Sequence, residues 1–285
     1  MFSHPLAFRL LWAYNIVLQK SKEEIFHLEV EMEEFYKFAL EVSYNAGEEL
    51  LGLFPKTHQI DYKGKINLVT EADLKSEAIF KKAIKAHYPE HGILAEESGL
   101  EEGEIKWIID PLDGTTNFAH GLPWFCTSLA LEVKGEIVLG VVYIPILKEC
   151  FSAIKGKGAF LNGKPIKVSK TKKIHQALLA TGFPYDIHQR PEPVVTRFKK
   201  MLMVARGVRR AGSAAMDLCY LACGRFDGFW EERLHPWDTA AGKLIVEEAG
   251  GMVSDFSGRP YSIYSKEILA TNGFLHQDMI KFLKE

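Results

Sequence analysis

Acidic residues follow directly on short apolar segments at two places in the first half of this chain. Glu96 comes after residues 93–95, and Asp110 comes after residues 107–109, with Asp113 three positions further on. Apolar segments of this length predict strands, and strand ends are where open sheets present functional groups. Because a buried carboxylate is costly unless it is paired, hydrogen-bonded or bound to a metal ion, these acids are candidates for a site.

The residues between the two aspartates suggest what such a site would bind. Pro111 and Gly114 predict a tight turn, in which Asp110, Asp113 and the carbonyl oxygen of Leu112 can face one centre. Carboxylate and carbonyl oxygens are hard ligands that suit Mg²⁺ better than zinc or copper. Taken alone, however, the segment favours an ordinary surface turn, since Asp, Pro and Gly are all turn formers. In the same way, an isolated Asp238 is typical of a helix N-cap.

The remaining patterns predict strands and helices that alternate in two unequal halves. We expect helices at 32–55, from about 74 to 87, at 194–204, 213–223 and 238–249, and at the end of the chain. We expect strands at 93–95, 107–109, 125–133, 136–144, 149–154, 177–181, 226–230, 252–254 and 268–271, the third to fifth of them forming an antiparallel meander. This alternation favours an α/β fold of sheets layered with helices.

The composition argues against nucleic acid, a membrane and zinc as partners of this chain. The chain has 285 residues, with 35 basic against 37 acidic side chains, so that no broad basic field for nucleic acid is expected. Residues 1–19 are apolar but are interrupted by Arg9 and Asn15, and this stretch is too short and too polar to span a bilayer. The four cysteines lack the spacing of a zinc site and are interpreted as reduced thiols of a cytoplasmic protein.

The length fits one two-lobed domain preceded by an extension. A new amphipathic pattern starts at Met32. We therefore expect residues 1–31 to be an appendage and residues 32–285 to be the functional domain. Its lobes are expected at about 32–170 and 171–285.

Several longer segments resemble the inositol monophosphatase family. Residues 107–118 (WIIDPLDGTTNF) are similar to its first signature, and residues 236–251 (PWDTAAGKLIVEEAGG) are similar to its second. Three shorter segments, 67–73, 96–98 and 212–217, match in the same order. The resemblance implies a five-layer α/β/α/β/α sandwich, a homodimer, and an enzyme that hydrolyses small sugar or cyclitol phosphates, with myo-inositol monophosphate or a close analogue as substrate.

The resemblance also implies the metal ligands and the reaction. Two or three Mg²⁺ ions per site are expected, with Mn²⁺ as an alternative, and a metal-activated water attacks phosphorus directly. The implied ligands are Glu96, Asp110 and the Leu112 carbonyl for the first ion, Asp110, Asp113 and Asp238 for the second, and Glu96 with Asp73 (through water) for a weaker third. Thr115, helped by Asp73 or Glu96, is expected to orient the water.

The implied substrate contacts come from both halves of the chain. They are Asp113, Gly114, Thr115, Gly212, Ser213, Ala214, Glu231 and Asp238, with Glu232 as the alternative to Glu231 and with the amides of Gly114 and Thr115 facing phosphate. Lys63 and Lys65 stand near a family lysine but need an alignment gap.

Two other functions remain open at this point. One is a fructose-1,6-bisphosphatase, alone or as a dual activity, because Arg209 and Arg210 could bind a second phosphate. The other is a regulatory binding protein with incidental phosphatase activity. Retention of Glu96, Asp110, Asp113 and Asp238 favours the enzyme.

Overall fold

The structure is a computed structural model that describes residues 22–54, 60–62 and 68–284, with side chains described for 30–54 and 71–284. The chain divides into two compact units, residues 1–41 and 42–285. Helix α2 (Lys22–Leu53) begins ten residues before the expected start at Met32. The expectations for residues 1–21, for Lys63 and Lys65 and for Asn67 lie outside the described residues.

The larger sheet contains the predicted meander. Its strand order is β10-β9-β8-β7-β6-β5-β3-β4, and neighbours run antiparallel except β3 and β5, which are parallel. The strands are β3 (Gly92–Ala95), β4 (Gly99–Glu101), β5 (Ile105–Asp113), β6 (Cys126–Val133), β7 (Glu136–Ile144), β8 (Glu149–Ile154), β9 (Gly158–Leu161) and β10 (Lys164–Pro165). Separately, β1 (Ile60–Tyr62) pairs with β2 (Leu68–Thr70).

The smaller sheet belongs to the second half of the chain. Its order is β12-β11-β13-β15-β14, in which β11 is parallel to both neighbours and β15 is antiparallel to both of its own. The strands are β11 (Leu178–Thr181), β12 (Gly207–Arg209), β13 (Gly228–Glu232), β14 (Met252–Ser254) and β15 (Glu267–Thr271).

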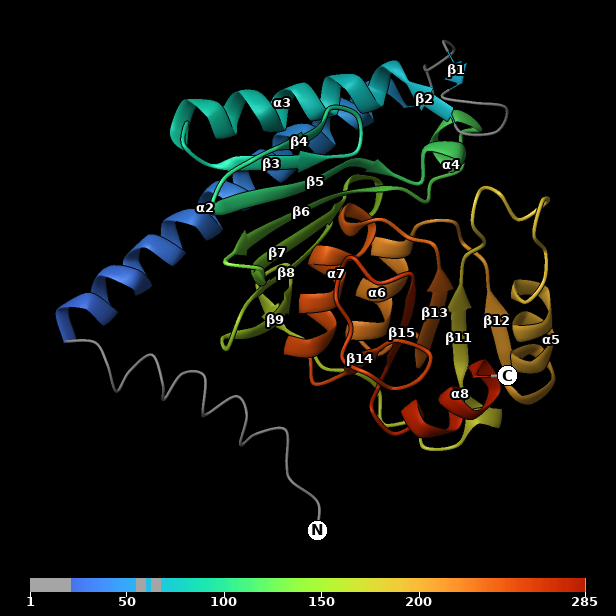
Figure 1. Cartoon of the computed structure of the whole chain (residues 1–285). Helices are drawn as coiled ribbons and strands as arrows, with labels where there is room; N and C mark the ends of the chain where they lie inside the picture. Colours follow the sequence, from blue (N-terminus) through green and yellow to red (C-terminus); the bar gives the residue numbers. More distant parts are fainter. Residues whose placement is uncertain (1–21, 55–59, 63–67, 285) are drawn as a thin grey trace. The chain divides into compact units, whose positions relative to one another are not determined.

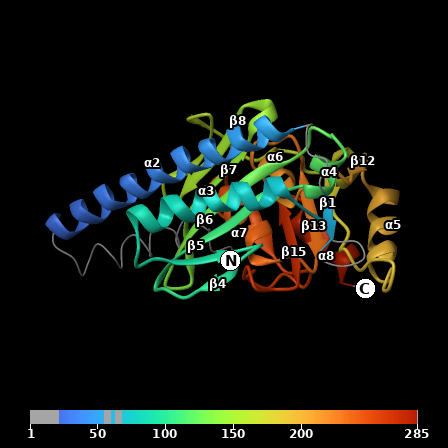
Figure 2. The ribbon, with the colours of Figure 1, turned by 90° about the horizontal axis from the view of Figure 1, so that it is seen from above.

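Helices cover both sheets and fill the space between them. They are α3 (Glu71–His87), α4 (Thr115–Ala119), α5 (Val194–Val204), α6 (Ala214–Ala222), α7 (Pro236–Glu248) and α8 (His276–Leu283), with 3₁₀ turns at Pro145–Leu147 and Ile174–Gln176. Figures 1 and 2 show α3, beside the part of α2 from Val42 on, over one face of the larger sheet. Helices α6 and α7 lie between the sheets, and α5 and α8 lie outside the smaller one. The predicted five-layer α/β/α/β/α sandwich is therefore confirmed.

The central layer explains why α6 and α7 are apolar on nearly every side. Leu218 and Leu244 are at most 2% exposed and belong to one core with Phe151 of the larger sheet and Phe229 of the smaller one. A helix between two sheets has no solvent face, so it must be hydrophobic around most of its circumference. Burying each of these side chains contributes about 2–3 kcal/mol. No helix among the described residues is long and apolar enough to cross a membrane.

A buried histidine makes the smaller lobe sensitive to acid. His276 is 2% exposed, and its two ring nitrogens lie 2.9 Å from Ser254 Oγ and 3.0 Å from Thr271 Oγ1. Burial lowers the pKa of His276 to about 4. The folded protein therefore resists protonation between pH 6.5 and 4, whereas the unfolded chain takes up the proton, and stability is lost as pH falls through this window.

We expect the free energy of unfolding to fall by about 2 kcal/mol as the pH is lowered from 7 to 5, because only the unfolded chain protonates this histidine. Urea unfolding of His276→Asn should show a pH dependence that is weaker by this amount than that of the wild type. The exposed His175→Asn should match the wild type. Equal pH slopes for wild type and His276→Asn would contradict the assignment.

Candidate active site

The parallel strands β3 and β5 bring two of the predicted acids to one edge of the larger sheet. Glu96 follows β3 directly, and its backbone N donates to the carbonyl oxygen of Ile109 in β5 at 3.3 Å. Asp110, the next residue of β5, is 1% exposed. The structure thus places these carboxylates side by side, as expected from the position of the acids in the sequence.

The segment from Asp110 to Asp113 is not the predicted turn after a strand. Strand β5 continues to Asp113, and its pairing with β6 shifts register between Asp110 and Asp113. In a regular strand, residues three apart face opposite sides of the sheet. The irregularity removes this alternation, so both carboxylates can reach one site. Asp110 Oδ1 also accepts a hydrogen bond from the Leu112 amide at 3.1 Å, which fixes the backbone there.

Gly114 then turns the chain into the short helix α4. Its φ of 98° lies in the left-handed region, and a Cβ would stand 2.7 Å from the Trp124 carbonyl oxygen, so only glycine fits. The next residue, Thr115, is 6% exposed. Its hydroxyl lies 3.1 Å from Asp73 Oδ1 and 3.0 Å from the carbonyl oxygen of Leu112.

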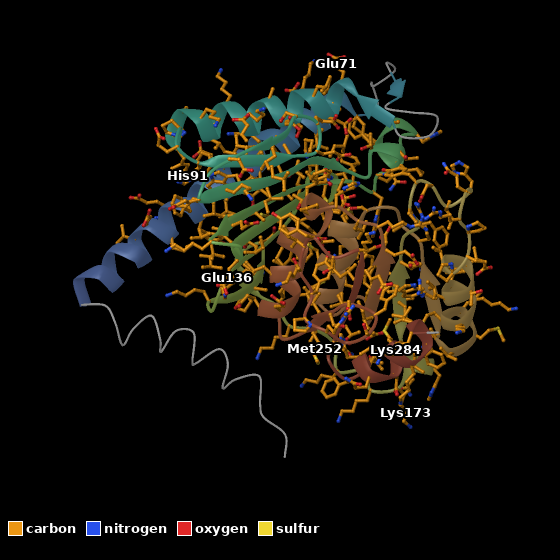
Figure 3. The ribbon with its side chains drawn as sticks, in the orientation of Figure 1. Glu71, His91, Glu136, Lys173, Met252 and Lys284 are labelled. Atoms are coloured by element: carbon orange, nitrogen blue, oxygen red, sulfur yellow. The ribbon has the colours of Figure 1, made fainter. Side chains whose placement is uncertain are left out.

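Helix α3 supplies Asp73 from its first turn. Figure 3 labels Glu71, which begins this helix, at the end nearest α4. Asp73 is 1% exposed, and one turn later Ser76 Oγ donates to the Pro111 carbonyl oxygen at 2.7 Å. The helix therefore supports the irregular part of β5 and brings Asp73 to the same place.

The second lobe reaches the site through α6 and α7. Ser213 Oγ donates to Asp113 Oδ2 at 2.8 Å, and the amide of Ala215 donates to the same oxygen at 2.7 Å. Asp238 is the third residue of α7, which begins at Pro236, so it is not the N-cap residue itself. Its Oδ2 accepts from the amide of His235 at 2.7 Å, within a capping box.

The acids that meet here repel one another. Burial raises the pKa of Asp110 well above its ordinary value, and the charges of Glu96, Asp113 and Asp238 raise it further. Burial likewise raises the pKa of Asp113 to about 6, although the hydrogen bonds from Ser213 and Ala215 lower it. Burial and the charge of Asp113 raise the pKa of Asp238 well above its ordinary value. A bound cation would relieve this repulsion.

The donor set fits a hard divalent cation. Four carboxylates and the Leu112 carbonyl are oxygen ligands of the kind that Mg²⁺ prefers. Among the described residues, no group of three or more histidine, cysteine, aspartate or glutamate side chains forms a ready-made cage for a metal ion. Mg²⁺ suits such an open site because it keeps several of its waters and takes the rest of its ligands from a few protein oxygens and substrate phosphate.

Glu231 lies inside the site, whereas Glu232 does not. Successive side chains of β13 point to opposite faces. Glu231 is 8% exposed, and burial raises its pKa to about 8, although the nearby charge of Arg210 lowers it. Glu232 instead forms an ion pair with Arg197 at 2.7 Å. Of the two glutamates that the sequence left open, Glu231 is the one that can face a substrate.

The segment 212–214 joins the site through a residue that the sequence did not single out. Asn117 Nδ2 donates to the carbonyl oxygens of Trp124 at 2.8 Å and Ala211 at 2.9 Å, and so ties α4 to the turn that contains Gly212. Gly212 has a φ of 90° and precedes Ser213, the N-cap of α6. No local pattern marks Asn117 for this role, because the carbonyl of Ala211 to which it donates lies 94 positions away in the chain.

The two arginines before Gly212 have different surroundings. Arg210 is an electrostatic neighbour of Glu231, and its guanidinium lies 5.6 Å from the centre of the Phe183 ring. Arg209, which is exposed as Arg210 is, donates to the carbonyl oxygen of its neighbour Val208 at 3.3 Å. Only Arg210 is close to the candidate site.

The chain is similar to known proteins over most of its length. A model of the inositol monophosphatase family matches residues 31–285. An inositol-1-monophosphatase of Synechocystis is 45% identical and covers 89% of this chain and 90% of its own length. A Vibrio cholerae protein named Nus factor SuhB is 42% identical, with coverage of 85% and 92%. The solved structure of a Thermotoga maritima IMPase has a TM-score of 0.83 at 37% identity and covers 88% of this chain and 97% of its own.

Proposed function

Because the chain belongs to the inositol monophosphatase family, we propose that it is a Mg²⁺-dependent phosphomonoester hydrolase acting on myo-inositol monophosphate or a close analogue. The observation that carries the proposal is the meeting of Glu96, Asp110, Asp113 and Asp238, which approach from β3, β5 and α7 and repel one another. These acids would hold two or three Mg²⁺ ions, together with the Leu112 carbonyl and, for a weaker third ion, Asp73. Mn²⁺ is the alternative ion.

The proposed reaction is direct hydrolysis. Water adds to phosphorus, the bond from phosphorus to the ester oxygen breaks, and the products are inorganic phosphate and the free alcohol. Bound Mg²⁺ would lower the pKa of water and neutralise charge on the entering and leaving oxygens. The protein then has little covalent work to do, because phosphoryl transfer depends mainly on positioning and charge neutralisation. We expect no phosphoenzyme intermediate.

Thr115 and Asp73 are the proposed catalytic residues, with Glu96 as the alternative partner of Thr115. The hydrogen bond of 3.1 Å between the Thr115 hydroxyl and Asp73 Oδ1 supports this role. The pair can hold a water molecule by one hydrogen bond and accept its proton. The amides of Gly114 and Thr115, at the start of α4, can donate to phosphate oxygens.

The alcohol part of the substrate is proposed to lie against the second lobe. The contacts would be Asp113, Gly212, Ser213, Ala214, Glu231 and Asp238. Support comes from the hydrogen bonds that tie Ser213 and Ala215 to Asp113, because they put the start of α6 beside the carboxylates. An ionised Glu231 can accept hydrogen bonds from ring hydroxyls.

Nothing in the described residues favours the other two functions. Arg210 is already beside Glu231, which makes it a weak candidate for a second phosphate and hence for fructose-1,6-bisphosphatase activity. The name of the SuhB relative refers to transcription, but this chain retains all four carboxylates of an enzyme. A homodimer, a cytoplasmic location and the absence of nucleic-acid and membrane partners are further parts of the proposal.

The decisive assay is phosphate release with and without Mg²⁺. The substrates are inositol 1-phosphate, fructose 1,6-bisphosphate, histidinol phosphate and 3′-phosphoadenosine 5′-phosphate. We expect inositol 1-phosphate to give the highest kcat/KM. If fructose 1,6-bisphosphate is turned over best, it takes the place of inositol 1-phosphate as the proposed substrate. The proposed function is refuted if none of the four esters releases phosphate in a Mg²⁺-dependent way.

Replacing Glu231 with Gln tests the substrate contacts separately. Loss of a charged hydrogen-bond acceptor should raise KM for inositol 1-phosphate by about 10- to 100-fold, corresponding to roughly 1.5–3 kcal/mol. The ratio of kcat/KM for this ester to that for p-nitrophenyl phosphate, which has no ring hydroxyls, should fall accordingly. Glu267→Gln on the neighbouring strand is the control. An unchanged ratio in Glu231→Gln would remove this residue from the substrate site.

A further inference from the structure

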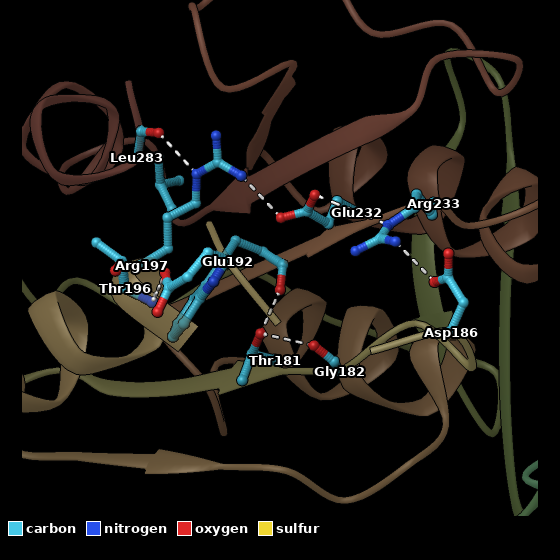
Figure 4. A network of polar contacts seen from close by, with 10 residues as sticks. Thr181, Gly182, Asp186, Glu192, Thr196, Arg197, Glu232, Arg233 and Leu283 are labelled. Atoms are coloured by element: carbon cyan, nitrogen blue, oxygen red, sulfur yellow. Dashed lines mark hydrogen bonds and ion pairs between the residues drawn. The ribbon is translucent and has the colours of Figure 1, made fainter. Parts of the chain in front are cut away.

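The segment between β11 and α5, residues 182–193, touches the end of β13 at two places. Gly182 lies against the carboxylate of Glu231 so closely that a Cβ there would overlap it. Four residues later, Asp186 Oδ1 accepts a hydrogen bond from Arg233 Nη1 at 2.7 Å (Figure 4). Glu231, the proposed acceptor of hydrogen bonds from substrate hydroxyls, and Arg233 therefore both contact this segment.

The end of β13 is a firm support for these contacts. Glu232 pairs with Arg197 at 2.7 Å, and both side chains are at most 15% exposed. Arg197 Nε also donates to the Leu283 carbonyl oxygen at 3.0 Å, so the pair connects β13, α5 and α8. Arg233 itself has a φ of 65°, and its amide donates to the Lys266 carbonyl oxygen at 2.6 Å. This hydrogen bond holds the backbone of Arg233 in place and so restricts where its guanidinium can lie.

A cavity borders the Arg233 side of the ion pair between Asp186 and Arg233. It has a volume of about 520 Å³ and is lined by Arg190, Glu192 and Pro193 of the segment and by Arg233 and Leu234 from the other side. The later half of the segment is thus not packed tightly against the end of β13. The ion pair is the polar contact that fixes the segment near Asp186.

Tyr185 lies between the two attachment points. Its neighbour Pro184 is buried, and the Phe183 ring packs edge-on against Phe198 at 5.5 Å. Tyr185 itself is 55% exposed. Partial burial and the negative charges of the four site acids Glu96, Asp113, Asp238 and Asp110 raise the pKa of Tyr185 above its ordinary value. Because Gly182, three residues earlier, lies against the Glu231 carboxylate and Asp186, one residue later, is bonded to Arg233, Tyr185 lies beside the carboxylate site.

We propose that Tyr185 forms a wall of the substrate site that contacts the hydroxylated ring, and that the ion pair between Asp186 and Arg233 positions it. This inference rests on the function proposed above and names a specificity-determining residue for it. An aromatic face packs on the C–H groups of a cyclitol or sugar, and the phenolic hydroxyl exchanges hydrogen bonds with ring hydroxyls. Asp186 and Arg233 do not touch the substrate and act through Tyr185.

The kinetic test compares an ester that carries ring hydroxyls with one that does not. Tyr185→Phe should raise KM for inositol 1-phosphate by about three- to tenfold, the effect of losing one neutral hydrogen bond. The ratio of kcat/KM for inositol 1-phosphate to that for p-nitrophenyl phosphate should fall by a similar factor. Tyr264→Phe, at another exposed tyrosine, is the control and should leave this ratio as in the wild type.

The positioning role is tested by Asp186→Asn and by a double variant. Asp186→Asn should lower the same ratio, and Tyr185→Phe combined with Asp186→Asn should lower it no further than Tyr185→Phe alone, because both act on one contact. Arg233→Gln should lower the ratio in the same way. Arg233→Lys keeps the positive charge and should lower the ratio less. Asp278→Asn breaks an ion pair of 2.8 Å on α8 whose aspartate is as exposed as Asp186 (46% against 45%), and it is the matched control.

A second measurement does not depend on activity. In protein labelled with 3-fluorotyrosine, the ¹⁹F resonance that is missing in Tyr185→Phe reports this ring. Added Mn²⁺ should broaden it far more than the resonance of Tyr264, and Asp186→Asn should reduce the broadening. The proposal is overturned if Mn²⁺ spares this resonance, or if the ratio in Tyr185→Phe stays within twofold of the wild type.

The two measurements separate this inference from the function on which it rests. If the wild type fails to release phosphate from inositol 1-phosphate, the proposed function fails. The ratio is then measured with whichever hydroxylated ester the wild type hydrolyses best, and the ¹⁹F experiment still decides where Tyr185 lies.

Discussion

Replacing Asp110 with Asn should lower kcat/KM for inositol 1-phosphate by at least about a thousandfold while leaving the fold intact. Asp110 lies at the centre of the acid cluster, and it is the proposed ligand of two ions. A lost metal ligand removes several kcal/mol of transition-state stabilisation, and each 1.36 kcal/mol is a factor of ten in rate. Phosphate release at saturating Mg²⁺ measures the loss.

The same change should not destabilise the metal-free protein. Burial and the charges of Glu96, Asp113 and Asp238 oppose ionisation of Asp110, so a neutral amide of equal size relieves repulsion. Thermal unfolding in the presence of a chelator should give Asp110→Asn a Tm at or above that of the wild type. Asp278→Asn, an exposed site on α8, is the control for both measurements. A rate near that of the wild type in Asp110→Asn would refute the metal assignment.

Removing divalent metal with a chelator should abolish phosphate release. In the metal-free protein, the free energy of unfolding should fall as the pH rises. Burial raises the pKa of Asp113 to about 6 and that of Glu231 to about 8 in the metal-free protein. A carboxyl group whose pKa is higher in the folded than in the unfolded protein stabilises the fold while it is protonated. This contribution is fully present below about pH 4 and is lost as the pH rises through 6 for Asp113 and 8 for Glu231. Between pH 5 and pH 8 these two carboxyl groups should together lose about 5 kcal/mol of unfolding free energy, and the opposite contribution of His276, about 2 kcal/mol, leaves a net loss on the order of 3 kcal/mol.

Added Mg²⁺ should reverse this trend. At 100 times its dissociation constant, a ligand that binds only the folded protein adds about 2.7 kcal/mol. The gain should be larger at pH 8 than at pH 5, because ionised carboxylates bind the ion. Urea unfolding at both pH values, with Mg²⁺ and with chelator, measures it, and K⁺ at equal ionic strength is the control. A stabilisation by Mg²⁺ that is independent of pH would contradict carboxylate binding.

Much of this architecture could be predicted from the sequence because local patterns and global fold agree. The apolar runs at 125–133, 136–144 and 149–154 lie close to the bounds of β6, β7 and β8. Glu96 and Asp110 were expected at strand ends, and the parallel pairing of β3 and β5 indeed brings them together. Such features depend on periodicity and on strand length, which a single sequence contains.

Other features of the site depend on tertiary contacts that no local pattern encodes. The sequence predicted a turn after residue 109, but pairing with β6 extends β5 to Asp113 with a shift of register. Pro and Gly are turn formers, and here the ladder overrides that preference. Similarly, Tyr185 and Asp186 stand in a segment without any periodicity. Their importance depends on the contact with Arg233, 47 residues away.

The hydrogen bond from Ser213 to Asp113 joins residues that are 100 positions apart in the chain. Asn117 and Ala211, 94 positions apart, make a second such connection. Contacts of this sequence separation close large loops, and forming them costs loop-closure entropy. Because both hydrogen bonds join the first lobe to the start of α6, the complete site exists only when the two lobes are docked on each other. Nascent chains released before α6 has been synthesised would be folded in part and chemically inert.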